Sequence, residues 1–195
     1  MSELISHLFD DRSQANSAVV ALERAGFKRD DISVLARGED GEPTTTDMSD
    51  SSATGNGATM GMVAGAGVGI LASIGAIAIP GIGPLVAAGI LATTVTAAGA
   101  GAVTGGIVGA LIEYGFSEDD ANVYSEAVRR GSVLVSVTTT PARANEAMAI
   151  MRDNGAVDAD SRRKQFEATG WKGYDPKAPP FSSEEAERER RRRSA

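Results

Sequence analysis

Side chains capable of acid–base or metal chemistry are few in this 195-residue chain. His7 is the one histidine, and the chain contains no cysteine. A general acid or base needs a positioned partner, and a metal site needs several ligands. The acids nearest to His7 in the sequence are Glu3 and Asp10, which form no recognisable set with it. We therefore predict a structural or surface role for His7, with no catalytic residue, no metal site and no cofactor.

Pairs of adjacent aspartates are the next candidates for acid–base chemistry. Each pair stands where a helix or a turn is expected to begin. A carboxylate at such a position caps free backbone N–H groups and compensates the helix dipole. We interpret all three pairs as capping residues rather than as catalytic carboxylates: Asp10-Asp11, Asp30-Asp31 and Asp119-Asp120.

A glycine-rich stretch, Gly65-Ala66-Gly67-Val68-Gly69, has some likeness to a dinucleotide-binding loop. That loop requires a preceding strand and an acidic residue about 20 residues later. Here the glycines lie inside a segment without any charge, where a helix is expected. We therefore reject nucleotide binding for this stretch.

Basic residues are concentrated at the C-terminal end of an acidic protein, whose formal net charge is -7. Residues 161–195 hold 10 bases and 6 acids, whereas residues 1–50 hold 5 bases and 11 acids. Binding of nucleic acid requires clustered Lys and Arg, which only this tail offers. Glutamates are interspersed with its arginines, so we interpret the tail as a solvated terminus and do not expect a nucleic-acid partner.

The segment around which the rest of the chain is organised is residues 51–112, which carry no charged side chain. Small residues recur in it every four positions, which places them on one face of a helix and allows close backbone packing. Residues 79–84, with two prolines and two glycines, interrupt the pattern. We predict a glycine-zipper helical hairpin with arms at 57–79 and 84–112, whose helix-packing residues are Gly57, Gly61, Gly65, Gly69 and Ser73, then Gly89, Thr93, Ala97, Gly101, Gly105 and Gly109.

Such arms have two possible environments. At about 1.5 Å per residue they would be about 34 Å and 43 Å long, more than the ~30 Å hydrocarbon core of a bilayer. Against a membrane, the nearest charges are acidic, and no Lys or Arg flanks either arm. The alternative is a soluble oligomer in which hairpins from several chains bury their apolar faces. We expect the membrane-associated form, with contact to lipid, on the cytoplasmic side of the inner membrane.

The regions on both sides of the hairpin have α/β patterns. Before it, we predict a strand at residues 3–9, a helix at 11–25 that ends at Gly26, and a strand at 31–37. After it, we predict a helix that starts at Ser117, and then a second strand–helix–strand series. The elements expected in that second series are a strand at 132–138, a helix at 140–155 and a short strand at 156–160.

The two flanking regions are related to each other. At an offset of 129 positions, residues 4–26 align with residues 133–155 without a gap. Strand falls on strand, helix on helix, and Gly26 on Gly155. Two β-α-β units of this kind usually form a four-stranded antiparallel sheet with helices on one face, the ferredoxin-like arrangement.

The expected fold is therefore α+β, a ferredoxin-like sheet of two βαβ halves with an inserted glycine-zipper hairpin. The hairpin would be dispensable for folding of the α/β domain. We expect the chain to be divided into residues 1–37 as the first βαβ half, 38–56 as a flexible linker, 57–112 as the hairpin, 113–160 as a helix plus the second half, and 161–195 as a basic tail.

Several motifs in the chain are distinctive as a set. They are FDDRSQANSAVVALERAGFKRDDISVLAR, IPGIGPLVAAG, EAVRRGSVLVSVTTTPARANEAMAIMRDNGAVDAD and GWKGYDPKAPPF. In these motifs the chain resembles the heat-induced stress (YflT-like) domain of bacterial general stress proteins and their central Gly-rich segment. The resemblance implies a stress-associated bacterial protein and transfers no catalytic residue.

The function that we expect from the sequence is a non-enzymatic one. The chain would self-associate as a homo-oligomer through the hairpin, at the inner membrane. The alternative is a soluble, cytoplasmic, oligomeric ligand-sensing module, since paired β-α-β domains often bind small molecules between protomers. The sequence names no ligand.

Overall fold

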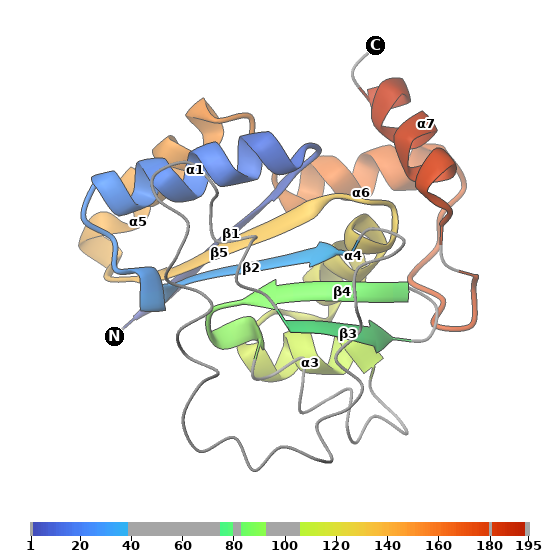
Figure 1. Ribbon diagram of the computed structural model, residues 1–195, viewed down its shortest axis with the longest axis horizontal. Helices are drawn as coiled ribbons and strands as arrows, with labels where there is room; N and C mark the ends of the chain where they lie inside the picture. The colour runs from blue at the N-terminus through green and yellow to red at the C-terminus, as the bar shows by residue number, and fades with distance from the viewer. Residues whose placement is uncertain (1, 39–74, 80–82, 93–105, 180, 194–195) are drawn as a thin grey trace.

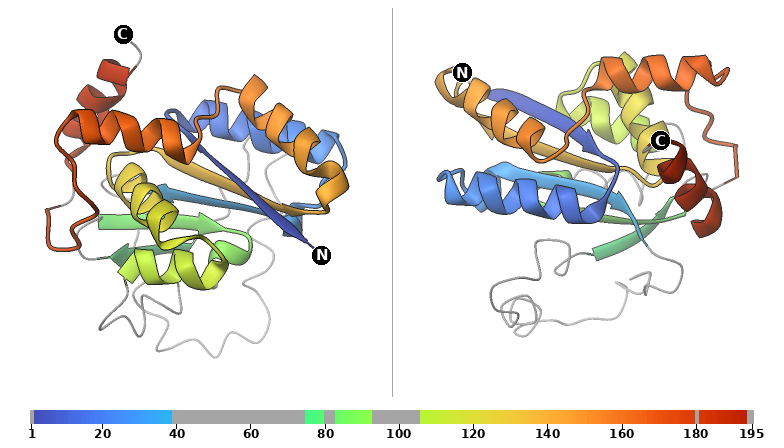
Figure 2. Two further views of the ribbon diagram at one scale, coloured as in Figure 1. Left: turned by 180° about the vertical axis from the view of Figure 1, so that it is seen from behind. Right: turned by 90° about the horizontal axis from the view of Figure 1, so that it is seen from above.

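The computed structural model describes residues 2–38, 75–79, 83–92, 106–179 and 181–193. These residues form a mixed α+β structure around one antiparallel sheet with the strand order β1-β5-β2-β4-β3 (Figure 1). Helices α1 and α5 cover one face of the sheet, and helices α3 and α4 cover the other, with α6 packed beside α4 (Figures 1 and 2).

The first strand–helix–strand unit forms as expected from its caps and apolar spacing. It consists of β1 (Glu3–Phe9), α1 (Arg12–Arg24), the 3₁₀ turn η1 (Arg29–Asp31) and β2 (Ile32–Arg37). Asp11 caps α1, because its side chain accepts a hydrogen bond from Ser13 N at 2.6 Å. Gly26 ends the helix with a φ of 85°, a left-handed conformation that favours glycine.

The second unit forms in the same way, after the predicted helix that Ser117 caps. That helix is α4 (Glu118–Arg129), and the unit itself consists of β5 (Val133–Thr139) and α5 (Pro141–Asp153). Pro141 occupies the first turn of α5, where its missing N–H costs nothing. The short strand expected at 156–160 is reduced to one bridge, between Val157 and Leu8.

The central segment is where the structure corrects the expected helical hairpin. Residues in both predicted arms form strands, β3 (Gly75–Ile79) and β4 (Gly83–Ala88), which pair with each other. Among the described residues of the two arms, helix is present at residues 90–92 and in α3 (Gly106–Tyr114). The remaining residues of both arms lie outside the described ranges.

The physical reason for this correction is pairing with β2. Without β4, the outer edge of β2 would leave its backbone groups without a partner, a cost that outweighs local helix preference. Residues 34–37 of β2 pair instead with residues 85–88 of β4. Pro84 fits because it pairs only with Ala78 of β3, beyond the end of the β2 register.

The two strands of the first unit are not neighbours in the sheet. β5 lies between them, antiparallel to both β1 and β2. β1 therefore lies at the border of the sheet, where Leu8 exchanges two backbone hydrogen bonds with Val157 at 2.9 and 2.7 Å. Figure 2 shows β1 along this border, between α5 and α4.

Each face of the sheet has its own apolar core. One core packs α1 and α5 on alternate residues of β1, β2 and β5. The other core combines Leu8, Leu35 and Leu134 of the sheet with side chains from α3, α4 and α6. The central segment completes this second core, with four side chains of zero exposure: Leu85, Leu91, Ile107 and Leu111. The described residues of the central segment therefore form part of the body of the protein.

The C-terminal region also packs on this second face. α6 (Ala159–Ala168) crosses the boundary expected at residue 160 and buries Arg162 and Phe166 almost completely. α7 (Ser183–Arg193) rests on the body through Ala186, which is 6 % exposed. Most of its described basic residues beyond Ala186 face solvent, as the sequence suggested.

In the described ranges, no helix combines the length and the apolar character that crossing a membrane requires.

Candidate functional site

Of the predicted helix-packing residues, the structure describes two, Gly89 and Gly109. The others lie outside the described residues: Gly57, Gly61, Gly65, Gly69, Ser73, Thr93, Ala97, Gly101 and Gly105. The packing face with four-residue spacing therefore stays a prediction, because the structure describes only these two of its residues.

Gly89 comes directly after β4 and serves a different purpose from helix packing. Its φ is 74°, and a Cβ there would lie 2.3 Å from the carbonyl oxygen of Ile32. Glycine is required at this point because the chain turns away from β4 directly against the backbone of β2. Gly109 is helical, in α3, and a Cβ there would meet no described atom within 4 Å.

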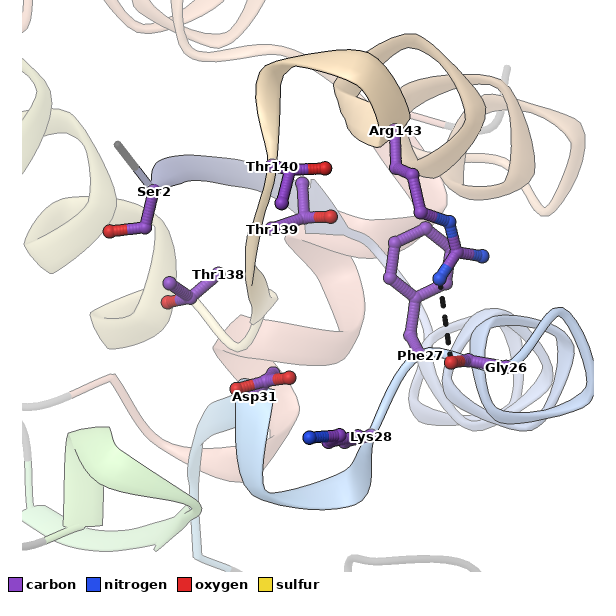
Figure 3. A pocket seen from close by; sticks show the side chains of 9 residues that line it. All are labelled: Ser2, Gly26, Phe27, Lys28, Asp31, Thr138, Thr139, Thr140 and Arg143. Carbon is purple, nitrogen blue, oxygen red and sulfur yellow. Dashed lines mark hydrogen bonds between the residues drawn. The ribbon is translucent and has the colours of Figure 1, made fainter.

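The larger of two pockets described here lies where α1 ends beside the start of α5 (Figure 3). We name it the threonine pocket. It has a volume of about 410 Å³ and is open to solvent. Its lining residues are Ser2, Gly26, Phe27, Lys28, Asp31, Thr138, Thr139, Thr140 and Arg143.

Arg143 forms one wall of the threonine pocket and holds two helices together. Its Nη2 donates to the carbonyl of Ala25 at 2.7 Å, and its Nη1 donates to that of Gly26 at 3.4 Å (Figure 3). Its guanidinium lies 3.9 Å from the ring centroid of Phe27, and Glu146 is its ion-pair partner. A cation at the carbonyl end of α1 stabilises that helix end. Arg143 is therefore fully engaged as a clamp.

The remaining polar groups of the threonine pocket suit a small polar ligand. Thr138, Thr139 and Thr140 contribute to the lining, as do Lys28 and Asp31 (Figure 3). Hydroxyls both donate and accept hydrogen bonds, and Lys28 adds a positive charge. Sequence reasoning missed this pocket, although Thr138 to Thr140 directly before Pro141 is a visible signal.

His7 lies inside the protein, with 9 % of its surface exposed. Burial lowers its pKa below the ordinary value of 6.5, since a charged imidazole is poorly solvated there. Asp158 raises the pKa and Arg152 lowers it, both by smaller amounts. The lowered pKa favours the neutral imidazole at pH 7.

His7 also lines the second pocket, which we name the edge pocket because it lies along the outer border of β1. Its volume is about 310 Å³. Ser117, Asp120 and Tyr124 of the α4 region line one side, and Met148 of α5 lines another. Burial raises the pKa of the Tyr124 hydroxyl, so this group stays protonated. The other lining residues are Leu4, Ile5, Ser6, Gly115 and Phe116.

The predicted capping aspartates are distributed over separate elements. Asp11 and Asp120 take part in helix caps, at α1 and α4. Asp10 accepts a hydrogen bond at 2.7 Å from the fully buried Arg162. Asp30 and Asp31 are in the turn η1. The three pairs therefore do not converge on one site.

A buried ion cluster links α4 to the C-terminal region. The carboxylate of Glu126, with no exposed surface, pairs with Arg129 at 2.7 Å and with Arg130 at 2.6 Å. Arg130 also pairs with Glu189 of α7 and lies 4.4 Å from the ring centroid of Phe166. A buried carboxylate with two cationic partners is a structural joint. It explains why the tail docks on α4, which charge counts alone could not predict.

Across the described ranges, no group of three or more His, Cys, Asp or Glu residues has the arrangement of a metal site. No protein-family model, curated protein or solved structure matches the chain.

Proposed function

We propose that this chain is a non-enzymatic, stress-associated bacterial protein that self-associates and has a ferredoxin-like body. The observation that carries this proposal is the antiparallel order Val157, β1, β5, β2, in which two β-α-β units interleave. That order is the one in which split β-α-β units form a ferredoxin-like sheet. The stress association rests on the resemblance of the sequence motifs to general stress proteins.

Self-association is assigned to the glycine-spaced segment. The segment is uncharged throughout residues 51–112, and an apolar surface of that size needs a partner. Its described part supplies Leu85, Leu91, Ile107 and Leu111 to the body of the protein. The self-association surface therefore falls to the glycine positions of the first arm, from Gly57 to Ser73, and to those from Ala97 to Gly105.

The location that goes with this proposal is the cytoplasmic side of the inner membrane, and a soluble cytoplasmic assembly is the alternative. Side chains that face the sheet cannot face lipid at the same time. The burial of Leu85 and Leu111 in the body thus favours the alternative for the second arm.

Fractionation and native mass measurement test both parts. Gly65→Leu and Gly105→Leu should break the oligomer, because a large side chain separates helices whose backbones touch, at a cost of about 1–3 kcal/mol per site. Ile70→Leu, off the glycine face, is the matched control and should assemble normally. Unchanged assembly of both glycine variants would refute the glycine-packing surface. Complete release from membranes by carbonate would refute the membrane location.

A second candidate function is ligand sensing by the threonine pocket. Three hydroxyls beside Lys28 favour small carboxylates or phosphates as ligands. A thermal-shift panel of these compounds should give a stabilising ligand whose effect disappears in Lys28→Ala. Lys164→Ala, an exposed lysine on α6, is the control and should respond as the wild type does. A panel without a stabilising compound would remove this candidate.

A further inference from the structure

The turn η1 brings two opposite charges to the threonine pocket. Lys28 directly precedes this turn and Asp31 ends it, and both side chains line the pocket. The N–H of Asp31 donates to the carbonyl of Lys28 at 3.0 Å, which closes one 3₁₀ turn. Residues three apart in such a turn project to the same side. The local backbone therefore presents an ammonium and a carboxylate together at the pocket.

Both charges are available to a ligand. Within the described ranges, neither the Lys28 ammonium nor the Asp31 carboxylate has an ion pair or a hydrogen bond. Arg143 differs, because Glu146 and the carbonyls at the end of α1 occupy its guanidinium. Among the described lining residues, the charges that remain for a ligand are one positive and one negative.

The end of β5 and the start of α5 add hydroxyl groups to the same pocket (Figure 3). Thr139 ends β5, and Thr140 occupies the N-cap position of α5. A threonine at an N-cap commonly accepts a hydrogen bond from the helix backbone, but the Thr140 side chain makes no such bond. A hydroxyl can donate to a carboxylate or accept from an ammonium. These threonines can therefore bond to either end of a ligand that carries both charges.

We propose that the threonine pocket binds a small zwitterion, a molecule with one ammonium and one carboxylate, such as a free amino acid. Asp31 binds the ammonium and Lys28 binds the carboxylate, while Thr139 and Thr140 add hydrogen bonds from the second repeated unit. This inference rests on the ligand-sensing candidate of the proposed function and narrows its ligand class.

The charge pattern discriminates between ligand classes. A simple carboxylate or a phosphate would pair with Lys28 but would bring its negative charge beside Asp31, and like charges in a binding site act against the wrong partner. A simple amine would meet the same repulsion from Lys28. A zwitterion pairs with both groups. The volume of about 410 Å³ is in the range of small-molecule sites.

Matched compounds test the ligand class on the full-length chain. L-alanine is compared with propionate and ethylamine, and γ-aminobutyrate with butyrate and propylamine, so that each counterpart lacks one charged group. NMR titration of the isotope-labelled chain measures the affinity and shows whether the amide signals that move belong to residues of the pocket. At least one zwitterion should bind there about tenfold or more tightly than both of its counterparts, since a hydrogen bond to a charged group is worth about that factor.

The outcomes separate this inference from the function on which it rests. Carboxylates that bind as tightly as their zwitterions in both series would overturn the inference and leave the ligand-sensing candidate standing. No binding by any of these compounds, nor by the panel of carboxylates and phosphates, would overturn both.

Substitution within the Asp30-Asp31 pair provides a second measurement. Asp31→Asn removes the negative charge but keeps the shape of the side chain, so the preference for the zwitterion over its carboxylate should disappear. Asp30→Asn, in the same turn but outside the pocket lining, is the matched control and should keep the preference. A preference that survives Asp31→Asn, or that is lost equally in Asp30→Asn, would overturn the proposal.

Discussion

The two repeated units, β1–α1–β2 and β5–α5–Val157, are closely alike up to the end of their helices. Both helices have 13 residues. Gly26 and Gly155 end them with φ values of 85° and 87°. The residue after each glycine donates its N–H at 3.1 Å to a carbonyl five residues earlier. The same local chemistry thus stops both helices at the same point.

The units diverge after this glycine. The first unit continues into β2, a full strand with neighbours on both sides. The second contributes only Val157 before Asp158 starts α6, where its side chain accepts a hydrogen bond from Ser161 N at 2.7 Å. A strong helix cap directly after a strand residue therefore cuts the strand short. Because of that early cap, Val157 is the one described residue that pairs with β1 on its outer side.

Among the substitutions considered, we expect the largest loss of stability at Gly89, where β4 docks on β2 of the first unit. Gly89→Ala should destabilise the protein by about 3 kcal/mol or more, because a Cβ in a left-handed conformation would also overlap the backbone of Ile32. Urea unfolding measures this change. Gly109→Ala, inside α3 with no described atom near its Cβ, should instead stabilise by about 0.5–1 kcal/mol. Equal stability of Gly89→Ala and the wild type would disprove the tight docking of β4 on β2.

The matched glycines of the two units should give a smaller effect. Gly26→Ala and Gly155→Ala should each cost about 1–2 kcal/mol, the cost of a left-handed conformation for a residue with a Cβ. Gly155→Ala should cost more, because its Cβ would lie 2.9 Å from Gln14 Nε2, whereas at Gly26 nothing described lies within 4 Å. Thermal unfolding of both variants provides the comparison. Equal losses would show that Gln14 moves aside without cost.

The matched helix caps should differ by less again. Asp11→Ala should cost about 1 kcal/mol, because it removes the acceptor for Ser13 N. Thr140→Ala, at the equivalent position of α5, should cost only a few tenths of a kcal/mol, since Thr140 makes no side-chain capping bond. Chemical denaturation of the two variants distinguishes them. Equal losses would mean that the two helix starts are stabilised alike.

The smallest effect should be the pH dependence due to His7, whose counterpart in the second unit is Ser136. The folded pKa of His7 lies below its ordinary value of 6.5, so the unfolded chain takes up the proton first. The contribution of His7 is complete above pH 6.5 and is lost as the pH falls toward the folded pKa. His7→Ser should reduce this loss, as measured by unfolding at pH 5 to 7. An unchanged pH profile would contradict the assignment.

The parts of the fold that local rules control could be predicted from the sequence. Asp11, Ser117, Pro141 and the stop glycines mark their helices, and apolar alternation marks β5. The strands β3 and β4 could not be predicted, since glycines four residues apart suit a helix and only the backbone of β2 selects a strand. The threonine pocket was missed because it depends on the packing of the end of α1 against α5, through Arg143.

The position of β5 between β1 and β2 has a consequence for synthesis on the ribosome. Neither strand of the first unit pairs with the other, so at that stage residues 1–37 have no sheet of their own among the described pairings. β2 can pair with β4 once residue 88 has been released, but β1 must wait for β5, which ends at residue 139. Long-range pairing of this kind slows folding and leaves apolar chain exposed to association. A nascent chain of this protein is therefore expected to be a chaperone client until its second half emerges.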